Sequence, residues 1–408
     1  MSPVPTTQPA NPSRPTVYLD QWVWIRMAQA LVGRPRVAGD DDALEAIRAA
    51  SAAGVAFPLS ATHYEETLRI TDPNQRRDLA TVMAVVSEMR TIRNQTDLVR
   101  HQFLCALHET VGRPFFHPAS IEPLGVGAYW AFRGRHAFLR VIDAEGRVDE
   151  SADSDWVRRI NQYAEAALLA GPTDDDVAFL DEDGYVTPRS HETAPGNRLA
   201  WEQLLEERLA EERRPAPTEL RVWLLARELS HEYLDLLNAL FAEYRLSLSS
   251  ISPVADGVKS RKRIVNFVER VPTLRIAADM KLEVFRDSNR RWSWNMLRDI
   301  DALSLAIPYC DVVVTDKDAA ALAHRTQAPN RHSTIVTSRL GELVEVLADL
   351  TTTASSIVED RNGWDQVAPG SGFELTSPTP LTAEDVAAGR VVRMLDSDGT
   401  QVTSRSRH

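Results

Sequence analysis

Met296–Ala320, MLRDIDALSLAIPYCDVVVTDKDAA, is the stretch that decides the fold. An apolar helical run begins around Asp299 and Asp301, and a proline ends it. The β-branched run Val312–Thr315 then leads directly to Asp316, as in a short buried strand. Ligands of open α/β folds bind at the carboxyl ends of the parallel strands. The stretch therefore predicts a helix and a strand that bring acidic side chains to such an end.

The N-terminal part of the chain repeats this arrangement of strand, polar residue and helix. Thr16–Leu19 is a short β-type run that ends on Asp20, and a helical pattern follows it. Val55–Leu59 is a second candidate for a buried strand, and Ser60 after it is a good N-cap for the helix ATHYEETLRI. We therefore expect an α/β fold with a small, mainly parallel sheet flanked by helices.

The alternation of strands and helices stops in the middle of the chain, which predicts a large and mostly helical insertion. Within it, Phe138–Val148 resembles a hairpin. Strand and helix signals return after the insertion, where Ser333–Thr337 is a predicted strand and Leu340–Leu350 a predicted helix. A short strand is also predicted near Arg390–Met394. The predicted divisions are a disordered arm (1–15), the first part of the α/β domain (16–75), the insertion (76–270), the second part of the domain (271–350) and a polar tail (351–408).

The composition narrows the class of protein and its partners. The chain has 408 residues, 43% of them hydrophobic, and a net charge of −12, so a nucleic acid would need a local basic patch or bound cations. The only cysteines, Cys105 and Cys310, form no CxxC pair, which favours a reducing cytoplasm. No apolar run approaches the ~18 residues that a transmembrane helix needs, so no membrane association is expected.

Acidic residues follow the predicted strands and open the helices next to them. Carboxylates gathered at one sheet edge repel each other unless a cation holds them, and a hard divalent ion is the usual one. Asp20 could instead be only a helix N-cap, and so could Asp299. The candidates are Asp20, Glu66 (or Glu65), Asp301 (with Asp299 in reserve) and Asp316 (or Asp318).

The motifs YLDQW, SATHYEET, DIDALSLA and VVVTDKD, in this order, resemble the acidic motifs of the PIN-domain-like nuclease superfamily. The resemblance covers only about 16–70 and 273–350. Glu66 lies six residues after Ser60, and Asp301 precedes an Ala-Leu pair, as in the family pattern. Gln21 departs from that pattern, because the family often has Thr, Ser or Asn after the first Asp.

This resemblance implies endonucleolytic cleavage of phosphodiesters with Mg²⁺ or Mn²⁺. Asp20, Glu66, Asp301 and Asp316 would be the catalytic carboxylates, with Asp299 as a further metal ligand. RNA is the expected substrate, with single-stranded DNA as an alternative. Many bacterial members are toxins or phage-defence effectors, and a regulatory protein partner or a homo-oligomer would fit such a role.

Basic residues supply candidates for nucleic-acid binding. Arg286, Arg290 and Arg291 precede Asp299 and are followed by Trp292 and Trp294, which could stack on bases, although a solvated helix end with core tryptophans would look the same. Lys259 and Arg261 begin the densest basic run, which also fits a solvated helix face. The sequence has no P-loop, HExxH or GxSxG motif. The alternative to a nuclease is a non-catalytic protein- or RNA-binding module with the same fold.

Overall fold

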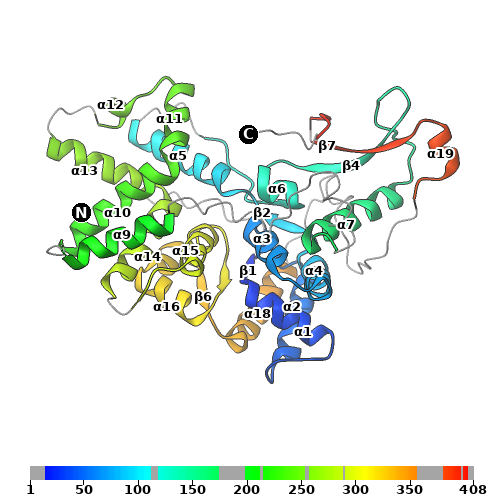
Figure 1. The fold of residues 1–408 in the computed structure, drawn as a ribbon, viewed down its shortest axis with the longest axis horizontal. Coiled ribbons are helices and arrows are strands. Elements are labelled where there is room, and N and C mark those ends of the chain that lie inside the picture. The colour runs from blue at the N-terminus through cyan, green and yellow to red at the C-terminus, as the bar shows by residue number, and fades with distance from the viewer. Residues whose placement is uncertain are drawn as a thin grey trace.

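The computed structural model describes residues 14–111, 118–173, 198–211, 215–252, 257–287, 290–355, 380–396 and 398–402. Its centre is a parallel sheet in the order β1-β5-β6 (Figure 1). Val17 pairs with Val312 and Leu19 with Val314, although almost 300 residues separate them in the chain. The sheet therefore joins the two predicted halves of the α/β domain. Its strands are β1 (Val17–Leu19), β5 (Val312–Val314) and β6 (Ile335–Thr337).

Alternate residues of these strands enter different hydrophobic clusters, because successive side chains of a strand point to opposite faces. Val17 and Leu19 pack in one cluster with α1, α2, α4 and α18, whereas Tyr18 and Val313 pack in another with α14, α15 and α16. The expectation of a small parallel sheet flanked by helices is thus confirmed. The helices are α1 (Gln21–Leu31), α2 (Asp40–Ala52), α4 (Pro73–Ser87), α14 (Pro272–Arg286), α15 (Trp294–Ala306), α16 (Lys317–Arg325) and α18 (Leu340–Ser355).

The segment predicted as a strand at Val55–Leu59 forms only two isolated parallel bridges. Ala56 pairs with Thr16 beside β1, and Leu59 pairs with Thr91 in β2. Pro58 between them has no N–H to donate, which interrupts a continuous ladder. The neighbouring strands are β2 (Arg90–Ile92) and β3 (Leu124–Val126), which pair antiparallel, and α3 (Ala61–Arg69) follows the bridged segment.

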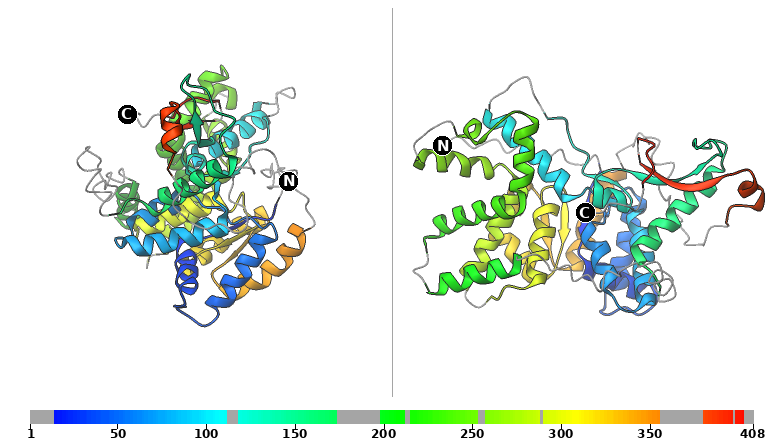
Figure 2. Two further views of the ribbon diagram at one scale, coloured as in Figure 1. Left: turned by 90° about the vertical axis from the view of Figure 1, so that its right-hand side faces the viewer. Right: turned by 45° about the horizontal axis from the view of Figure 1, so that its top comes forward.

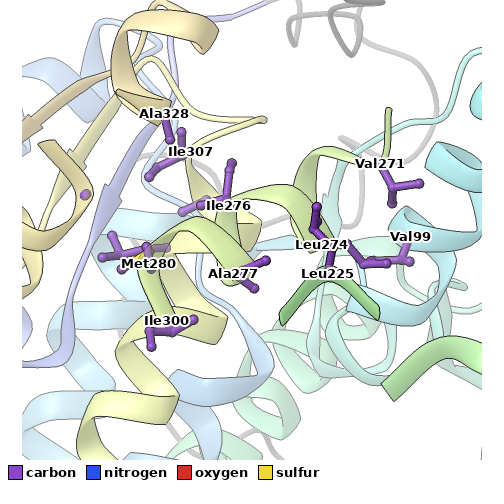
Figure 3. Packing of buried hydrophobic residues seen from close by; sticks show 14 of the residues in the cluster. Val99, Leu225, Val271, Leu274, Ile276, Ala277, Met280, Ile300, Ile307 and Ala328 are labelled. Carbon is purple, nitrogen blue, oxygen red and sulfur yellow. The ribbon is translucent and has the colours of Figure 1, made fainter. Parts of the chain in front are cut away.

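The helices of the predicted insertion share one core with the second half of the domain. Figure 3 shows Val99 of α5 and Leu225 of α10 beside Leu274 of α14. The boundary expected at residue 76 falls inside α4. These helices are α5 (Gln95–Val111), α9 (Arg198–Glu211), α10 (Pro217–Glu228), the π-helix η1 (Leu229–Tyr233), α11 (Leu234–Glu243), α12 (Leu248–Ile251) and α13 (Gly257–Val268).

The predicted hairpin at Phe138–Val148 is largely replaced by a long-range pairing. Only Ile142 and Val148 form a bridge there, whereas β4 pairs along its whole length with β7 near the C-terminus (Figure 2). The strand predicted near Arg390–Met394 is therefore present as β7. This region comprises α6 (Ala128–Arg133), β4 (Ala137–Ile142), α7 (Ser154–Ala170), α19 (Ala383–Ala387) and β7 (Val391–Asp396), and α17 (Ala328–His332) precedes β6.

Among the described residues, no helix combines the length and the apolar character that a membrane span requires.

Candidate functional site

Asp20 and Asp316 follow the adjacent parallel strands β1 and β5 and also cap the helices that come next. Asp20 Oδ1 accepts a hydrogen bond from the Gln21 N–H (2.6 Å), and its Oδ2 accepts one from Thr315 Oγ1 (3.1 Å). Asp316 Oδ1 accepts from the N–H groups of Asp318 (2.7 Å) and Ala319 (2.9 Å). Asp20 therefore is the N-cap of α1 and also lies at the sheet edge. The two roles are compatible, because the capping hydrogen bond fixes the carboxylate at the end of the strand.

His63 attaches α3 to the end of β1 and so places Glu66. Its Nδ1 accepts from the Ser60 N–H (2.9 Å), and its Nε2–H donates to the Leu19 carbonyl (2.8 Å). Burial lowers the pKa of His63 to about 4, so the ring stays neutral in this clamp. Glu66 lies one turn further along α3 and is half-buried, whereas Glu65 is exposed. The structure therefore favours Glu66 over Glu65.

Asp299, and not Asp301, belongs to the acidic cluster. Burial, together with the charges of Asp20, Asp316 and Glu66, raises the pKa of Asp299 to about 8. Asp301 is not among the charges that act on Asp20, Glu66 or Asp299, so the structure groups Asp299 with these carboxylates in place of the Asp301 that the sequence suggested. Ser293, and not Asp299, is the N-cap of α15.

Asp301 points to a different neighbour. Arg198 of α9 donates two hydrogen bonds to its carboxylate, at 2.8 and 2.9 Å. An α-helix turns about 100° per residue, so side chains two positions apart on α15 point in nearly opposite directions. Once Asp299 lies beside the sheet edge, Asp301 must lie on the other side of α15.

The carboxylates of Asp20, Glu66, Asp299 and Asp316 form the acidic cluster. Burial raises the pKa of Glu66 to about 7, with the charge of Asp20 as the next cause. Burial also raises the pKa of Asp20, against the hydrogen bonds from Gln21 and Thr315. In the described part of the chain, none of the four carboxylates has a Lys, Arg or His within ion-pair distance. The cluster therefore gathers carboxyl groups that no described basic side chain pairs with directly, and the raised pKa of Asp299 means that this group keeps its proton at neutral pH.

The chemistry of these donors fits a hard divalent cation, because all of them are carboxylate oxygens. As the side chains stand, no three His, Cys, Asp or Glu residues of the described ranges converge tightly enough to form a metal centre. Mg²⁺ binds through as few as one or two carboxylates and keeps several waters. The fit therefore rests on the oxygen donors and on the uncompensated charge.

The structure does not bring the predicted basic residues into one patch at the acidic cluster. Arg286 pairs with Glu283, Arg290 with Asp287, and the exposed Arg291 with Glu206, so each cation already has an acidic partner. Trp292 is buried against Phe285, which contradicts a base-stacking role for it. Lys259 and Arg261 are exposed on α13, at the outer edge of the helical region and away from β1 (Figure 1).

Sequence reasoning overlooked the partner of Asp301 and the residue that orients Asp20. Arg198 lies in a charged stretch that offers no motif, so its pairing with Asp301 has no local signal. Thr315 precedes Asp316 in the predicted strand end, and a hydroxyl there is a signal that could have been connected with Asp20.

Comparisons with protein families, curated proteins and solved structures find no match to this chain.

Proposed function

We propose that this protein is a divalent-metal-dependent endoribonuclease that uses the carboxylates of Asp20, Glu66, Asp299 and Asp316. The observation that carries the proposal is the uncompensated acidic cluster at the carboxyl ends of β1 and β5. The four sequence motifs that resemble PIN-like nucleases supply the reaction class. The assignment of Asp299 in place of Asp301 keeps the order of Asp, Glu, Asp and Asp, but it departs from the third motif, because the Ala-Leu pair of the family pattern follows Asp301.

The four carboxylates would have two kinds of role in the proposed site. Asp20 and Asp316 are held rigidly by backbone N–H groups and by Thr315, which suits groups that must keep a fixed geometry. Asp299 and Glu66 come from helices on either side and complete the oxygen donor set. A bound Mg²⁺ or Mn²⁺ would supply charge neutralisation of the phosphate, an activated water and stabilisation of the leaving oxygen.

The assay incubates purified protein with end-labelled RNA and single-stranded DNA in Mn²⁺ or Mg²⁺. We expect the wild type to cleave RNA, and Asp20→Asn and Asp299→Asn to lose at least a hundred-fold in rate, because each removes a charged ligand. Asp349→Asn is the matched control, since Asp349 is an exposed acid of α18 and is not among the candidate ligands. Equal cleavage by wild type and Asp299→Asn would overturn the assignment, and no cleavage of any substrate would favour a non-catalytic binding module.

The proposal extends to a toxin or phage-defence effector, as the family resemblance implies. Induced expression in a bacterial host should then arrest growth for the wild type and not for Asp299→Asn at equal protein level. Growth arrest by both proteins would show that the toxicity does not depend on the acidic cluster.

A further inference from the structure

A polar pocket lies beside α15 and is lined by Asp301 and not by Asp299. Its volume is about 210 Å³. That space suits a small heterocycle better than a single ion. The residues of its lining that matter here are Gln95, Thr96, Arg198, Glu228, Glu232 and Asp301.

One wall of this pocket is an irregular piece of helix. The π-helix η1 continues α10 and presents Glu232 and Tyr233 to the pocket. Short π-helical segments inside longer helices are frequent at functional sites, because they redirect side chains at a cost in backbone geometry. Gln95 donates a hydrogen bond to the Tyr233 hydroxyl, which fixes the ring against α5.

The charges of the pocket favour a ligand that donates hydrogen bonds. Among the described residues that line it, Arg198 is the only cation, and it already pairs with Asp301 and with Glu232 Oε1 at 2.7 Å. Buried Lys281 holds Glu228 through Oε1. Among the described residues, neither Glu228 Oε2 nor Glu232 Oε2 accepts a hydrogen bond. These acidic acceptors would repel a phosphate and would attract N–H groups.

The pocket is also close to the proposed site of cleavage. Asp301 in its lining and Asp299 in the acidic cluster lie two positions apart on α15, about 3 Å along the helix axis and on opposite sides of a helix about 10 Å wide. A single-stranded RNA with a phosphate at the acidic cluster would have to pass around α15 to bring a nearby base to the pocket. Sequence-specific recognition of RNA uses such unstacked bases and reads their Watson–Crick edges.

We propose that this pocket binds a guanine base of a single-stranded RNA substrate, with its N1–H and N2–H₂ donating to the Glu232 carboxylate. Guanine is the RNA base with two adjacent donors on its Watson–Crick edge, and a carboxylate accepts such a pair in bidentate fashion. The inference rests on the proposed ribonuclease function, because it takes the base from the strand bound at the acidic cluster.

The test measures binding and does not require cleavage. Asp299→Asn protein is titrated into labelled oligouridine strands that carry one central G, A, C or U, and fluorescence anisotropy gives each affinity. We expect the G strand to bind on the order of ten-fold more tightly than the others. Adding Glu232→Gln should remove this preference, and adding Glu219→Gln, an exposed acid at the start of α10, should keep it.

A second variant keeps the test independent of the fold around Glu232. Thr96 lines the pocket and is exposed, so Thr96→Trp can fill the opening without entering the core. It too should abolish the guanine preference. Equal binding of the four strands, or a guanine preference that survives both Glu232→Gln and Thr96→Trp, would overturn the inference. Failure of the nuclease assay alone would leave the binding preference measurable, so the two failures are distinguishable.

Discussion

Neutralising Asp299 should stabilise the metal-free protein, whereas neutralising Asp301 should destabilise it. The two carboxylates lie two positions apart on α15, but one faces other acids and the other pairs with Arg198. Asn has nearly the shape of Asp, so Asp299→Asn and Asp301→Asn change charge with little change in packing. The opposite signs test the assignment of the cluster without any activity measurement.

The magnitude for Asp299 comes from its raised pKa. An unperturbed Asp has a pKa near 3.9, and each pKa unit corresponds to about 1.4 kcal/mol, so a rise to about 8 sets a ceiling of about 5–6 kcal/mol. Asn still has to be buried as a polar group and water still reaches the half-buried position, so we expect a gain of about 1–3 kcal/mol in unfolding free energy. Loss of the Asp301 carboxylate leaves Arg198 with Glu232 alone and should cost about 1–2 kcal/mol.

The sign of the pH dependence follows from linkage. Between about pH 4 and pH 8 the folded state retains a proton on Asp299 that the unfolded chain has lost, so the stability of the wild type falls as pH rises through this range. The advantage of Asp299→Asn should therefore be absent below about pH 4, grow up to about pH 8 and level off above it.

The assay is urea unfolding followed by tryptophan fluorescence, in EDTA, at several pH values between 4 and 9. Asp318→Asn is the control for an exposed acid and should change the unfolding free energy by less than about 0.5 kcal/mol. An Asp299→Asn protein less stable than the wild type at pH 8.5, or a difference independent of pH, would refute the reasoning.

Three further predictions concern the clamp, the buried ion pairs and the metal. His63→Phe keeps a ring but removes the hydrogen bond to Leu19 that ties α3 to β1 and the hydrogen bond from the Ser60 N–H at the start of α3, so it should cost about 2–4 kcal/mol in urea unfolding. An unchanged midpoint would contradict the clamp. Lys281→Met should cost about 3–5 kcal/mol, because it leaves Glu228 buried without its ion-pair partner and Glu202 with Arg227 alone. Adding Glu228→Gln to this variant should recover part of that loss, and no recovery would argue against the charge as the cause. Mn²⁺ should raise the thermal unfolding midpoint of the wild type in an EDTA-reversible way and leave Asp299→Asn nearly unaffected, and equal shifts in both proteins would place the ion elsewhere.

Local patterns in the sequence predict most of the elements near the site. The β-branched runs before Asp20 and Asp316 form β1 and β5, and Ser60 caps α3 as expected, because these signals act within a few residues. The hairpin at Phe138–Val148 and the strand at Val55–Leu59 were predicted less well. The strand β4, at the start of that hairpin, pairs with a strand about 250 residues later in the chain, which no local pattern indicates. The apolar run Val55–Leu59 contains Pro58, which interrupts the pairing of a continuous strand.

The sequence by itself determined the types of residue at the strand ends and the order in which the acidic motifs follow each other. Only the tertiary structure decided which of the acids meet. The helical period implies that Asp299 and Asp301 point apart, but the packing of α15 against the sheet decides which of them joins Asp20, Glu66 and Asp316. The physical reason is that such choices depend on contacts between segments distant in the chain, as when Arg198 withdraws Asp301 from the cluster by a bidentate ion pair.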